Sequence, residues 1–500
     1  MSDQVYLYIA LGIYFAGMLA IGFFAARRTK DHEDYMLAGR NLPPWVAALS
    51  AGASDMSGWL VMGLPGAIYA TGLIEAWIAI GLTIGAYLNW LIVAPRLRAY
   101  TEVSNNSITV PSFFENRLKD RSRLLRIVSA LIILVFFTLY ISSGMVAGGV
   151  FFESSFDGDY LVGMLLVTGV TLAYTLFGGF LGASLTDVAQ GLLMMVALVL
   201  VPVVAIANVG GLGAVGEAIA SASPDALSFT GGEALSGATV LAIVSALAWG
   251  LGYFGQPHII VRFMALPSPA GAKPARRIGI GWMVISMGGA VIAGLAGIAY
   301  FDQPGVEELA NPETVVLRMS QILLHPLIAG FVLAAVLAAI MSTISSQLIV
   351  CSSALVEDLY KVVRKAPPRD RTLVILGRSC VLAVAIVAAL LAISPNDTIL
   401  GLVAFAWAGF GASFGPLILL SLFWKRLTAW GALAGMVSGS VIVFTWPLLG
   451  TGVYELLPGF IGALIIAVLV SLATYRANAD IEREFTDTAA LTIARPGAPA

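Results

Sequence analysis

Long apolar runs dominate this chain, and polar segments between them are short. A bilayer core takes about 20 apolar residues per helix, whereas a membrane barrel strand alternates polar and apolar positions over about ten residues. The unbroken runs of this chain fit only the first pattern. We therefore expect an all-α membrane protein with thirteen transmembrane helices. They are predicted near residues 5–25, 44–70, 74–95, 125–150, 159–181, 187–208, 237–258, 278–300, 321–350, 372–393, 397–423, 429–449 and 455–475.

Positive charge is distributed unevenly among the segments that join these runs. With the N-terminus outside, 26 of the 27 Lys and Arg residues fall in cytoplasmic loops or at their flanks, and only Arg318 falls outside. Cytoplasmic loops of membrane proteins carry such an excess, and a missing or additional span would break the alternation. Basic residues follow the first run, at Arg27, Arg28 and Lys30, and none precedes it. This order predicts a retained span and not a cleaved signal peptide.

Composition narrows the function. The chain is 59% hydrophobic and 11% charged, against about 25% charged residues in soluble domains. Its net charge of −2 gives no electrostatic basis for binding nucleic acid. It has no phosphate-binding loop and no metal motif, and its two cysteines, Cys351 and Cys380, cannot build a disulfide framework. We expect no enzyme, no cofactor and no obligate protein partner, but a secondary transporter or a channel in membrane lipid. A single transmembrane domain, 1–476, precedes a short tail, 477–500.

The second run is interrupted by small polar residues around Asp55. A charged residue at mid-membrane costs about 2.5–3.5 kcal/mol on insertion scales, so it should face a cavity or a partner. Unwound backbone there exposes carbonyl oxygens that suit a hard cation such as Na⁺, and the next half-helix points its positive end at the break. The alternative is a helix-packing face of small residues with Asp55 capping the break.

The seventh run, 237–258, is broken as well. Three glycines and a proline interrupt it between Trp249 and His258, and paired broken helices are typical of the midplane site of transporters. The broken runs are the second and the seventh, so their starts are five spans apart. Since five is odd, a five-plus-five repeat must be inverted in the membrane, with repeat one at about 44–208 and repeat two at about 237–423. Trp249 and Tyr253 share a helix face and form either a wall for a small ring or ordinary core.

The ninth run carries a polar stripe. Ala339, Ser342 and Thr343 have i, i+3, i+4 spacing and share one face. Their oxygens could complete a sodium shell with carbonyls of the broken second helix. Alternatively, the hydroxyls bond back to carbonyls of their own helix, as Ser and Thr often do.

These stretches resemble the sodium/solute symporter family, and within it the bacterial branch that transports proline. The resemblance runs from about residue 5 to 475. One departure is Leu185, where the family usually has tryptophan, and the external loop at 209–236 and the C-terminal tail also look unlike the family's best-known members. The residues that carry the resemblance are Ala48–Trp59, Gly178–Gln190, Trp249–His258, Met341–Thr343 and Ala406–Gly411.

The resemblance implies roles for particular residues. It implies a leucine-transporter-like fold, with extra helices at both termini and Na⁺ held between the first helix of one repeat and the fourth of the other. The sodium residues are then Ala53, Asp55, Met56, Ala339, Ser342 and Thr343. The substrate residues are Ser57, Gly58, Trp59, Tyr140, Trp249, Tyr253 and Pro257. Asp187 is implied on the sodium release route, and Arg40 and Glu75 are implied in gating.

The expected function is sodium-coupled uptake of L-proline by alternating access. The resemblance further implies a bacterial inner (plasma) membrane, with the N-terminus outside and the C-terminus in the cytoplasm. A symporter for another small carboxylate or neutral solute would share the same features. The aromatic-lined broken helices argue against a channel, and about 25 residues after the last predicted span are too few for a sensor kinase.

Overall fold

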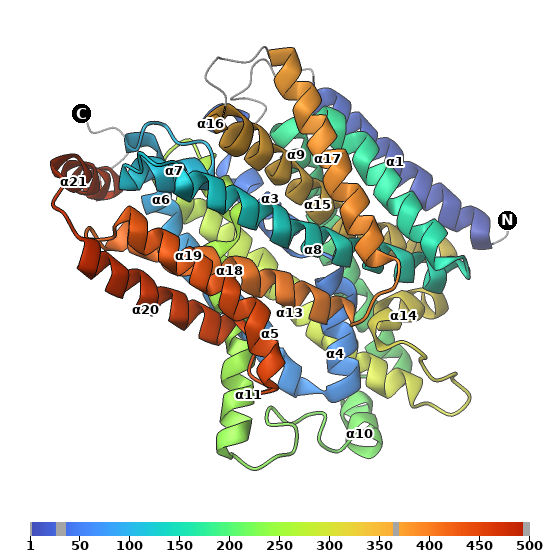
Figure 1. Cartoon of the computed structure of the whole chain (residues 1–500). Helices are drawn as coiled ribbons and strands as arrows, with labels where there is room; N and C mark the ends of the chain where they lie inside the picture. The colour runs from blue at the N-terminus through green and yellow to red at the C-terminus, as the bar shows by residue number, and fades with distance from the viewer. Residues whose placement is uncertain (1–2, 27–36, 364–369, 494–500) are drawn as a thin grey trace.

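The computed structural model describes residues 3–26, 37–363 and 370–493, and within these ranges it contains helices and no strand. Eleven helices among the described residues are long and apolar enough to cross a membrane. They pack side by side around a buried interior (Figure 1). The expectation of an all-helical membrane protein is therefore confirmed. Arg27, Arg28 and Lys30, which were assigned to the first cytoplasmic loop, lie outside the described residues.

Helices of the N-terminal half are α1 (Asp3–Ala26), α3 (Pro44–Asp55), α4 (Leu64–Thr71), α5 (Ala76–Leu88), α6 (Ala94–Val103), α7 (Val110–Leu118), α8 (Leu124–Phe156), α9 (Tyr160–Val209) and α10 (Leu212–Ala222). The C-terminal half contains α11 (Gly237–Leu247), α12 (Pro257–Met264), α13 (Ala272–Phe301), α14 (Val315–Leu323), α15 (Pro326–Ser353), α16 (Lys361–Val363), α17 (Asp370–Ala392), α18 (Ile399–Phe423), α19 (Ala429–Thr445), α20 (Leu456–Thr474) and α21 (Ala479–Ile493). Short 3₁₀ or π segments join them, namely η1 (Ala38–Arg40), η2 (Trp59–Gly63), η3 (Leu73–Glu75), η4 (Asn89–Val93), η5 (Ala248–Gly255), η6 (Pro269–Gly271), η7 (Pro312–Thr314), η8 (Ala354–Tyr360) and η9 (Trp446–Leu449).

Two of the thirteen predicted spans are not among these eleven helices. The span at 44–70 is interrupted, so each of its pieces is too short to count as a spanning helix. The spans at 159–181 and 187–208 form one helical element of 50 residues, α9, with no assigned break. The small residues between the two apolar runs include no proline, and helical backbone continues through them. The predicted interruption at 182–186 is thus wrong at the level of secondary structure.

The ends of α9 nevertheless lie toward the same end of the molecule. A straight helix of this length would measure about 75 Å, more than twice a bilayer core. At its start, the Tyr160 hydroxyl donates to the carbonyl of Ala392, the last residue of α17. At its end, Val209 packs against the same small apolar cluster as Tyr69 of α4. The segment η7 contacts α4 and also the start of α18. Since α18 directly follows α17, the start and the end of α9 lie on the same side of the molecule.

Glycines allow the second broken span to pack closely. A Cβ on Gly250 of η5 would lie 2.2 Å from the carbonyl oxygen of Gly81 on α5. A Cβ on Gly252 would lie 1.9 Å from the indole nitrogen of Trp407 on α18. Only glycine therefore fits at these two positions, and the absence of side chains lets η5 lie against both α5 and α18.

The polar tail after residue 476, for which no fold was predicted, forms the helix α21. This helix packs against α6 (Figure 1). Its Phe485 ring lies 4.8 Å from the guanidinium carbon of Arg96 and 5.7 Å from that of Arg117. Two cations on one ring fasten the tail to the body of the protein.

Candidate functional site

The site begins at the interruption between α3 and η2. Helix α3 ends at Asp55 because Met56, with φ −80° and ψ 84°, leaves the helical region. The backbone N–H of Ser57 then donates to the Asp55 carbonyl at 3.0 Å, and the chain resumes helical geometry at Gly58. The Asp55 carbonyl also accepts hydrogen bonds from the Trp59 indole at 3.0 Å and from the Tyr140 hydroxyl at 3.3 Å. The side chains of Trp59 and Tyr140 therefore supply hydrogen bonds to a backbone carbonyl at the interruption of the helix.

Helix α15 meets this break through the predicted polar stripe. The Ser342 hydroxyl lies 2.9 Å from the Ala53 carbonyl and 3.1 Å from the Ala339 carbonyl. The Thr343 hydroxyl lies 3.3 Å from the same Ala339 carbonyl. We call these four residues the oxygen cradle. All four are buried, and carbonyl and hydroxyl oxygens are the ligands that hard cations prefer. The structure thus brings together four of the six residues predicted to hold sodium.

The other two sodium candidates, Asp55 and Met56, line a neighbouring cavity. The Tyr253 hydroxyl of η5 donates to Asp55 Oδ2, so the carboxylate links the two broken spans directly. Asp55 Oδ1 has no hydrogen-bond partner among the described residues, and neither does the amide oxygen of Asn89 in the same cavity. Asn89 was not predicted. A lone asparagine in an apolar run carries no periodic signal that would have marked it.

Aromatic rings line the predicted substrate side. The rings of Trp59 and Trp249 lie 6.2 Å apart, and those of Trp249 and Trp407 lie 6.4 Å apart. Tyr454 stacks on Trp249 at 5.3 Å, and Tyr253 meets Trp407 edge-on at 5.1 Å. Trp59, Trp249 and Tyr253 were predicted. Trp407 and Tyr454 were given no role, although the resemblance did include the stretch around Trp407.

The remaining substrate candidates fall at different distances from these rings. Tyr140 joins them through its contact with the Asp55 carbonyl. Gly58 packs so tightly that a Cβ there would lie 2.8 Å from the Cβ of Ala147. Ser57 lies beside Trp59, with its hydroxyl 3.5 Å from the Trp59 backbone nitrogen. Pro257 starts α12 and lines a second cavity, together with residues of α7 and η8, so its place is less direct.

Asp187 lies at the centre of a buried polar cluster. Its Oδ2 accepts hydrogen bonds from the Ser50 hydroxyl at 2.7 Å and from Arg262 Nη2 at 2.9 Å. Arg262 also donates to the Ser346 hydroxyl at 2.8 Å. Four elements, α3, α9, α12 and α15, therefore meet at one ion pair. The sequence placed Arg262 at a loop flank, but the structure buries it, because the carboxylate of Asp187 offsets the cost of burying its charge.

The two predicted gating residues lie apart from the oxygen cradle. Arg40 is buried and donates to the Thr101 hydroxyl at 3.1 Å, the Ser107 carbonyl at 2.7 Å and the Met264 carbonyl at 3.0 Å. It therefore ties η1 to α6 and to the end of α12. Glu75 lies in η3, after the far end of α4. The two residues are not brought together.

The sequence of this chain is similar to those of known transporters. Residues 35–439 match the model of the sodium:solute symporter family. The chain is 57% identical over 472 residues to the high-affinity proline transporter PutP of Bacillus subtilis, which covers 94% of this chain and 98% of that protein. It is 50% identical over 490 residues to sodium/proline symporters of Staphylococcus aureus, covering 95% of this chain and 94% of theirs.

Solved structures show the same fold. The structure of a Na⁺-coupled sialic acid symporter, in a substrate-bound outward-open state, matches with a TM-score of 0.81 at 22% identity, covering 95% of this chain and 99% of that one. The nucleobase–cation symporter Mhp1 matches with a TM-score of 0.56 at 15% identity, covering 91% of this chain and 98% of the other. At these identities the comparison concerns the fold alone.

Proposed function

The chain belongs to the sodium:solute symporter family, and from this we propose that it couples inward movement of Na⁺ to uptake of L-proline by alternating access. The names of its relatives supply the substrate, since proteins 50–57% identical to it over most of its length are proline transporters. The observation that best supports the mechanism is the 2.9 Å contact between Ser342 and the Ala53 carbonyl. It joins the broken span to α15 through oxygen atoms alone.

The oxygen cradle is the proposed sodium site, together with Asp55 and Met56. A cation held between α3 and α15 fixes the position of the break relative to the rest of the protein. Bound Na⁺ would therefore order the segment that receives proline, and bound proline must raise the affinity for Na⁺ by the same factor. Each Na⁺ that moves inward contributes about 2.3 kcal/mol per 100 mV of membrane potential, besides its concentration gradient.

Proline is proposed to bind where η2 begins. Its carboxylate would lie at the positive end of the resumed helix, near Ser57 and Gly58, because helix N-termini attract anions. Its ring would lie against Trp59 and Trp249, with Tyr140, Tyr253 and Pro257 completing the site. The bend of η5 and its glycines hold Trp249 and Tyr253 near Trp407, so the aromatic wall depends on both broken spans.

We also propose how the chain crosses the membrane. We infer thirteen spans in one domain, 1–476, of which 44–208 and 237–423 form inverted repeats, followed by the short tail 477–500. The N-terminus faces outward, and the tail lies in the cytoplasm of a bacterium, beneath its inner membrane. On this topology, Asp187 serves sodium release, and Arg40 and Glu75 act in gating at opposite ends of the protein.

Uptake of labelled proline into proteoliposomes tests the function. Gradients of Na⁺, Li⁺ and H⁺ are applied in turn, and other small carboxylates and neutral solutes compete with proline. The proposal requires saturable uptake that depends on a Na⁺ gradient and that excess unlabelled proline abolishes. Uptake that ignores the Na⁺ gradient would refute the coupling. Uptake of a different solute in preference to proline would keep the coupling and replace the substrate.

A further inference from the structure

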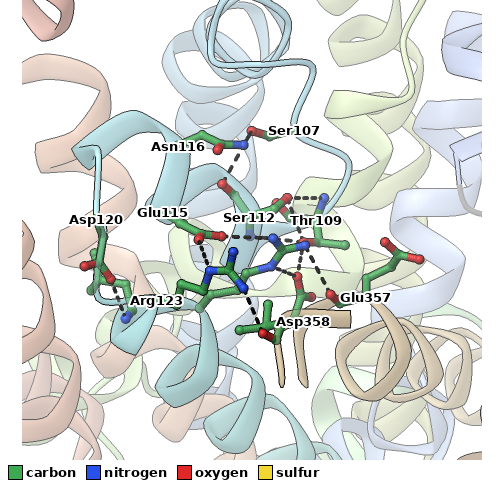
Figure 2. A network of polar contacts seen from close by, with 12 residues as sticks. Ser107, Thr109, Ser112, Glu115, Asn116, Asp120, Arg123, Glu357 and Asp358 are labelled. Atoms are coloured by element: carbon green, nitrogen blue, oxygen red, sulfur yellow. Dashed lines mark hydrogen bonds and ion pairs between the residues drawn. The ribbon is translucent and has the colours of Figure 1, made fainter. Parts of the chain in front are cut away.

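A polar network lies where α7, α8 and η8 meet (Figure 2). Arg126 of α8 is its centre, because its guanidinium donates to Asp358 Oδ1 at 2.8 Å, to Glu115 Oε2 at 2.9 Å and to the Glu357 carbonyl at 3.2 Å. The Thr109 hydroxyl adds a second hydrogen bond to Asp358 Oδ1 at 2.9 Å. One arginine thus holds three elements together, although the proposed transport site does not involve it.

One carboxylate oxygen of Asp358 accepts no hydrogen bond from the described residues. Its side chain is buried, and its Oδ2 has no hydrogen-bond partner among the described residues. A buried carboxylate oxygen without a donor is costly unless a ligand or ion reaches it. Asp358 also lines the cavity that extends to Arg262 and Ser346, and the rest of that cavity is mostly apolar. The residue with the unpaired carboxylate oxygen therefore also lines the cavity.

The cavity follows one face of α15. Ser342 of the oxygen cradle, Ser346, Val350 and Ser353 are spaced by three or four residues, so they share that face. Ser346, Val350 and Ser353 all line the cavity. From Ser346 to Asp358 is 12 residues, or about 18 Å of helix at 1.5 Å per residue. A single helix face thus joins the oxygen cradle, the Asp187–Arg262 pair and Asp358.

The backbone geometry changes where α15 ends and η8 begins. The turn that carries Asp358, η8, is a π-helix, a rare geometry that often occurs at functional sites. Three cations of the network, Arg123, Arg126 and Lys361, form ion pairs with Glu115, Glu357 and Asp358. Removing Arg126 from Asp358 would leave a net negative site at the end of the cavity.

We propose that Asp358 is a cation-binding station at the inner end of the sodium exit route, and that Arg126 occupies it and closes the route when no ion is passing. A Na⁺ that leaves the oxygen cradle passes Ser346 and Asp187, follows the cavity and displaces Arg126 from Asp358. The Thr109 hydroxyl is a second ligand. This proposal rests on the proposed function, because it identifies where the coupling ion leaves.

Transport measured from the cytoplasmic side tests the station. In proteoliposomes of known orientation, the readout is the cytoplasmic Na⁺ concentration that half-maximally supports proline efflux. Arg126→Gln should lower this concentration about tenfold, because the carboxylate loses its competitor. Asp358→Asn, alone or combined with Arg126→Gln, should raise it about tenfold. Arg123→Gln is the matched control and should change it less than about twofold, since Arg123 reaches Glu115 but not Asp358.

A labelling experiment keeps the test independent of transport. Ser353→Cys, in a background carrying Cys351→Ala and Cys380→Ala, places one thiol in the cavity wall. Arg126→Gln should speed its reaction with a membrane-impermeant thiol reagent from the cytoplasmic face about tenfold, and cytoplasmic Na⁺ should slow it only when Asp358 is present. An unchanged sodium requirement in Asp358→Asn, or labelling that Arg126→Gln does not alter, would overturn the proposal. If the wild type itself shows no Na⁺-driven transport, the proposed function fails, and the labelling still decides about the gate.

Discussion

The Ser342 hydroxyl on α15 lies 2.9 Å from the Ala53 carbonyl on α3, across 289 positions of sequence. Ser342→Ala removes the one side chain that bridges the two helices of the oxygen cradle. We expect the Na⁺ concentration for half-maximal proline uptake to rise about tenfold, which corresponds to the loss of one hydrogen-bond-sized interaction. Maximal uptake at saturating Na⁺ should change less.

The control for this experiment is Thr168→Ala. The Thr168 hydroxyl is buried and bonds to the Met164 carbonyl of its own helix, so its loss should leave the Na⁺ requirement unchanged. If Ser342→Ala and Thr168→Ala behave alike, the oxygen cradle is an ordinary helix contact and not an ion site.

Tyr253→Phe separates the hydroxyl of this residue from its ring. The ring contact with Trp407 at 5.1 Å is kept, but Asp55 Oδ2 loses its donor. An unsatisfied buried acceptor costs about 1–3 kcal/mol, so we expect weaker Na⁺ binding and, through coupling, weaker proline binding. Tyr160→Phe is the control, because it removes one hydroxyl contact, to Ala392, far from the site. Equal effects in Na⁺-dependent proline binding would argue against a role for the Tyr253–Asp55 contact.

Gly58 tests how tightly the start of η2 is packed. A Cβ at this position would lie 2.8 Å from the Cβ of Ala147, so Gly58→Ala must displace η2 or α8. Overpacking of this kind typically costs about 1–3 kcal/mol, and here it should appear as a higher KM for proline. Gly17→Ala is the matched control, since no atom lies within 4 Å of a Cβ there. An unchanged KM in Gly58→Ala would place proline elsewhere.

Local patterns predicted the oxygen cradle, but they could not predict its surroundings. Ala339, Ser342 and Thr343 stand three and four residues apart, so their common face is readable from sequence. Trp407 and Tyr454 are more than 150 residues away from Trp249, and an isolated aromatic in an apolar run looks like ordinary core. Arg262 resembled a loop cation because it stands next to a basic segment. Only the tertiary fold shows that Asp187 lies beside it.

Spans were predicted well wherever one apolar run forms one helix. The prediction was wrong at 182–186, because the runs at 159–181 and 187–208 were assigned to two separate spans although helical backbone continues through α9. Small side chains permit a break without requiring one, and neighbouring helices decide the outcome. At Met56 the break was correct, since the freed backbone around it finds partners in Ser342, Trp59 and Tyr140.

The Asp187–Arg262 pair can be dissected with a double-mutant cycle. Both side chains are buried, and their nearest atoms lie 2.9 Å apart. Arg262→Gln should lower the free energy of unfolding by about 3–5 kcal/mol, because it leaves a buried carboxylate unpaired. Adding Asp187→Asn should restore part of that loss, which thermal unfolding in detergent would measure. Strictly additive effects would show that the two side chains do not stabilise each other.

Glu313 provides a pH-dependent contact outside the membrane spans. Its carboxylate accepts hydrogen bonds from the backbone N–H groups of Ile399 at 3.0 Å and Leu400 at 3.2 Å, at the start of α18. Burial raises the pKa of Glu313 above its ordinary value, and these two amides oppose part of the increase. A carboxyl group with a raised folded-state pKa stabilises the fold while it is protonated. That contribution is complete below its unfolded-state pKa and is lost as pH rises through the folded-state pKa.

Glu313→Gln should remove this dependence, because the amide keeps an acceptor oxygen for α18 and does not titrate. The difference in Tm between about pH 5 and about pH 8 should therefore be smaller in the variant than in the wild type. Thr398→Ala is the control. Its hydroxyl caps the same helix through the Gly401 backbone N–H at 3.0 Å, so its loss should lower stability by about 0.5–2 kcal/mol at both pH values. A pH dependence in Glu313→Gln as steep as that of the wild type would mean that the titration of another group governs it.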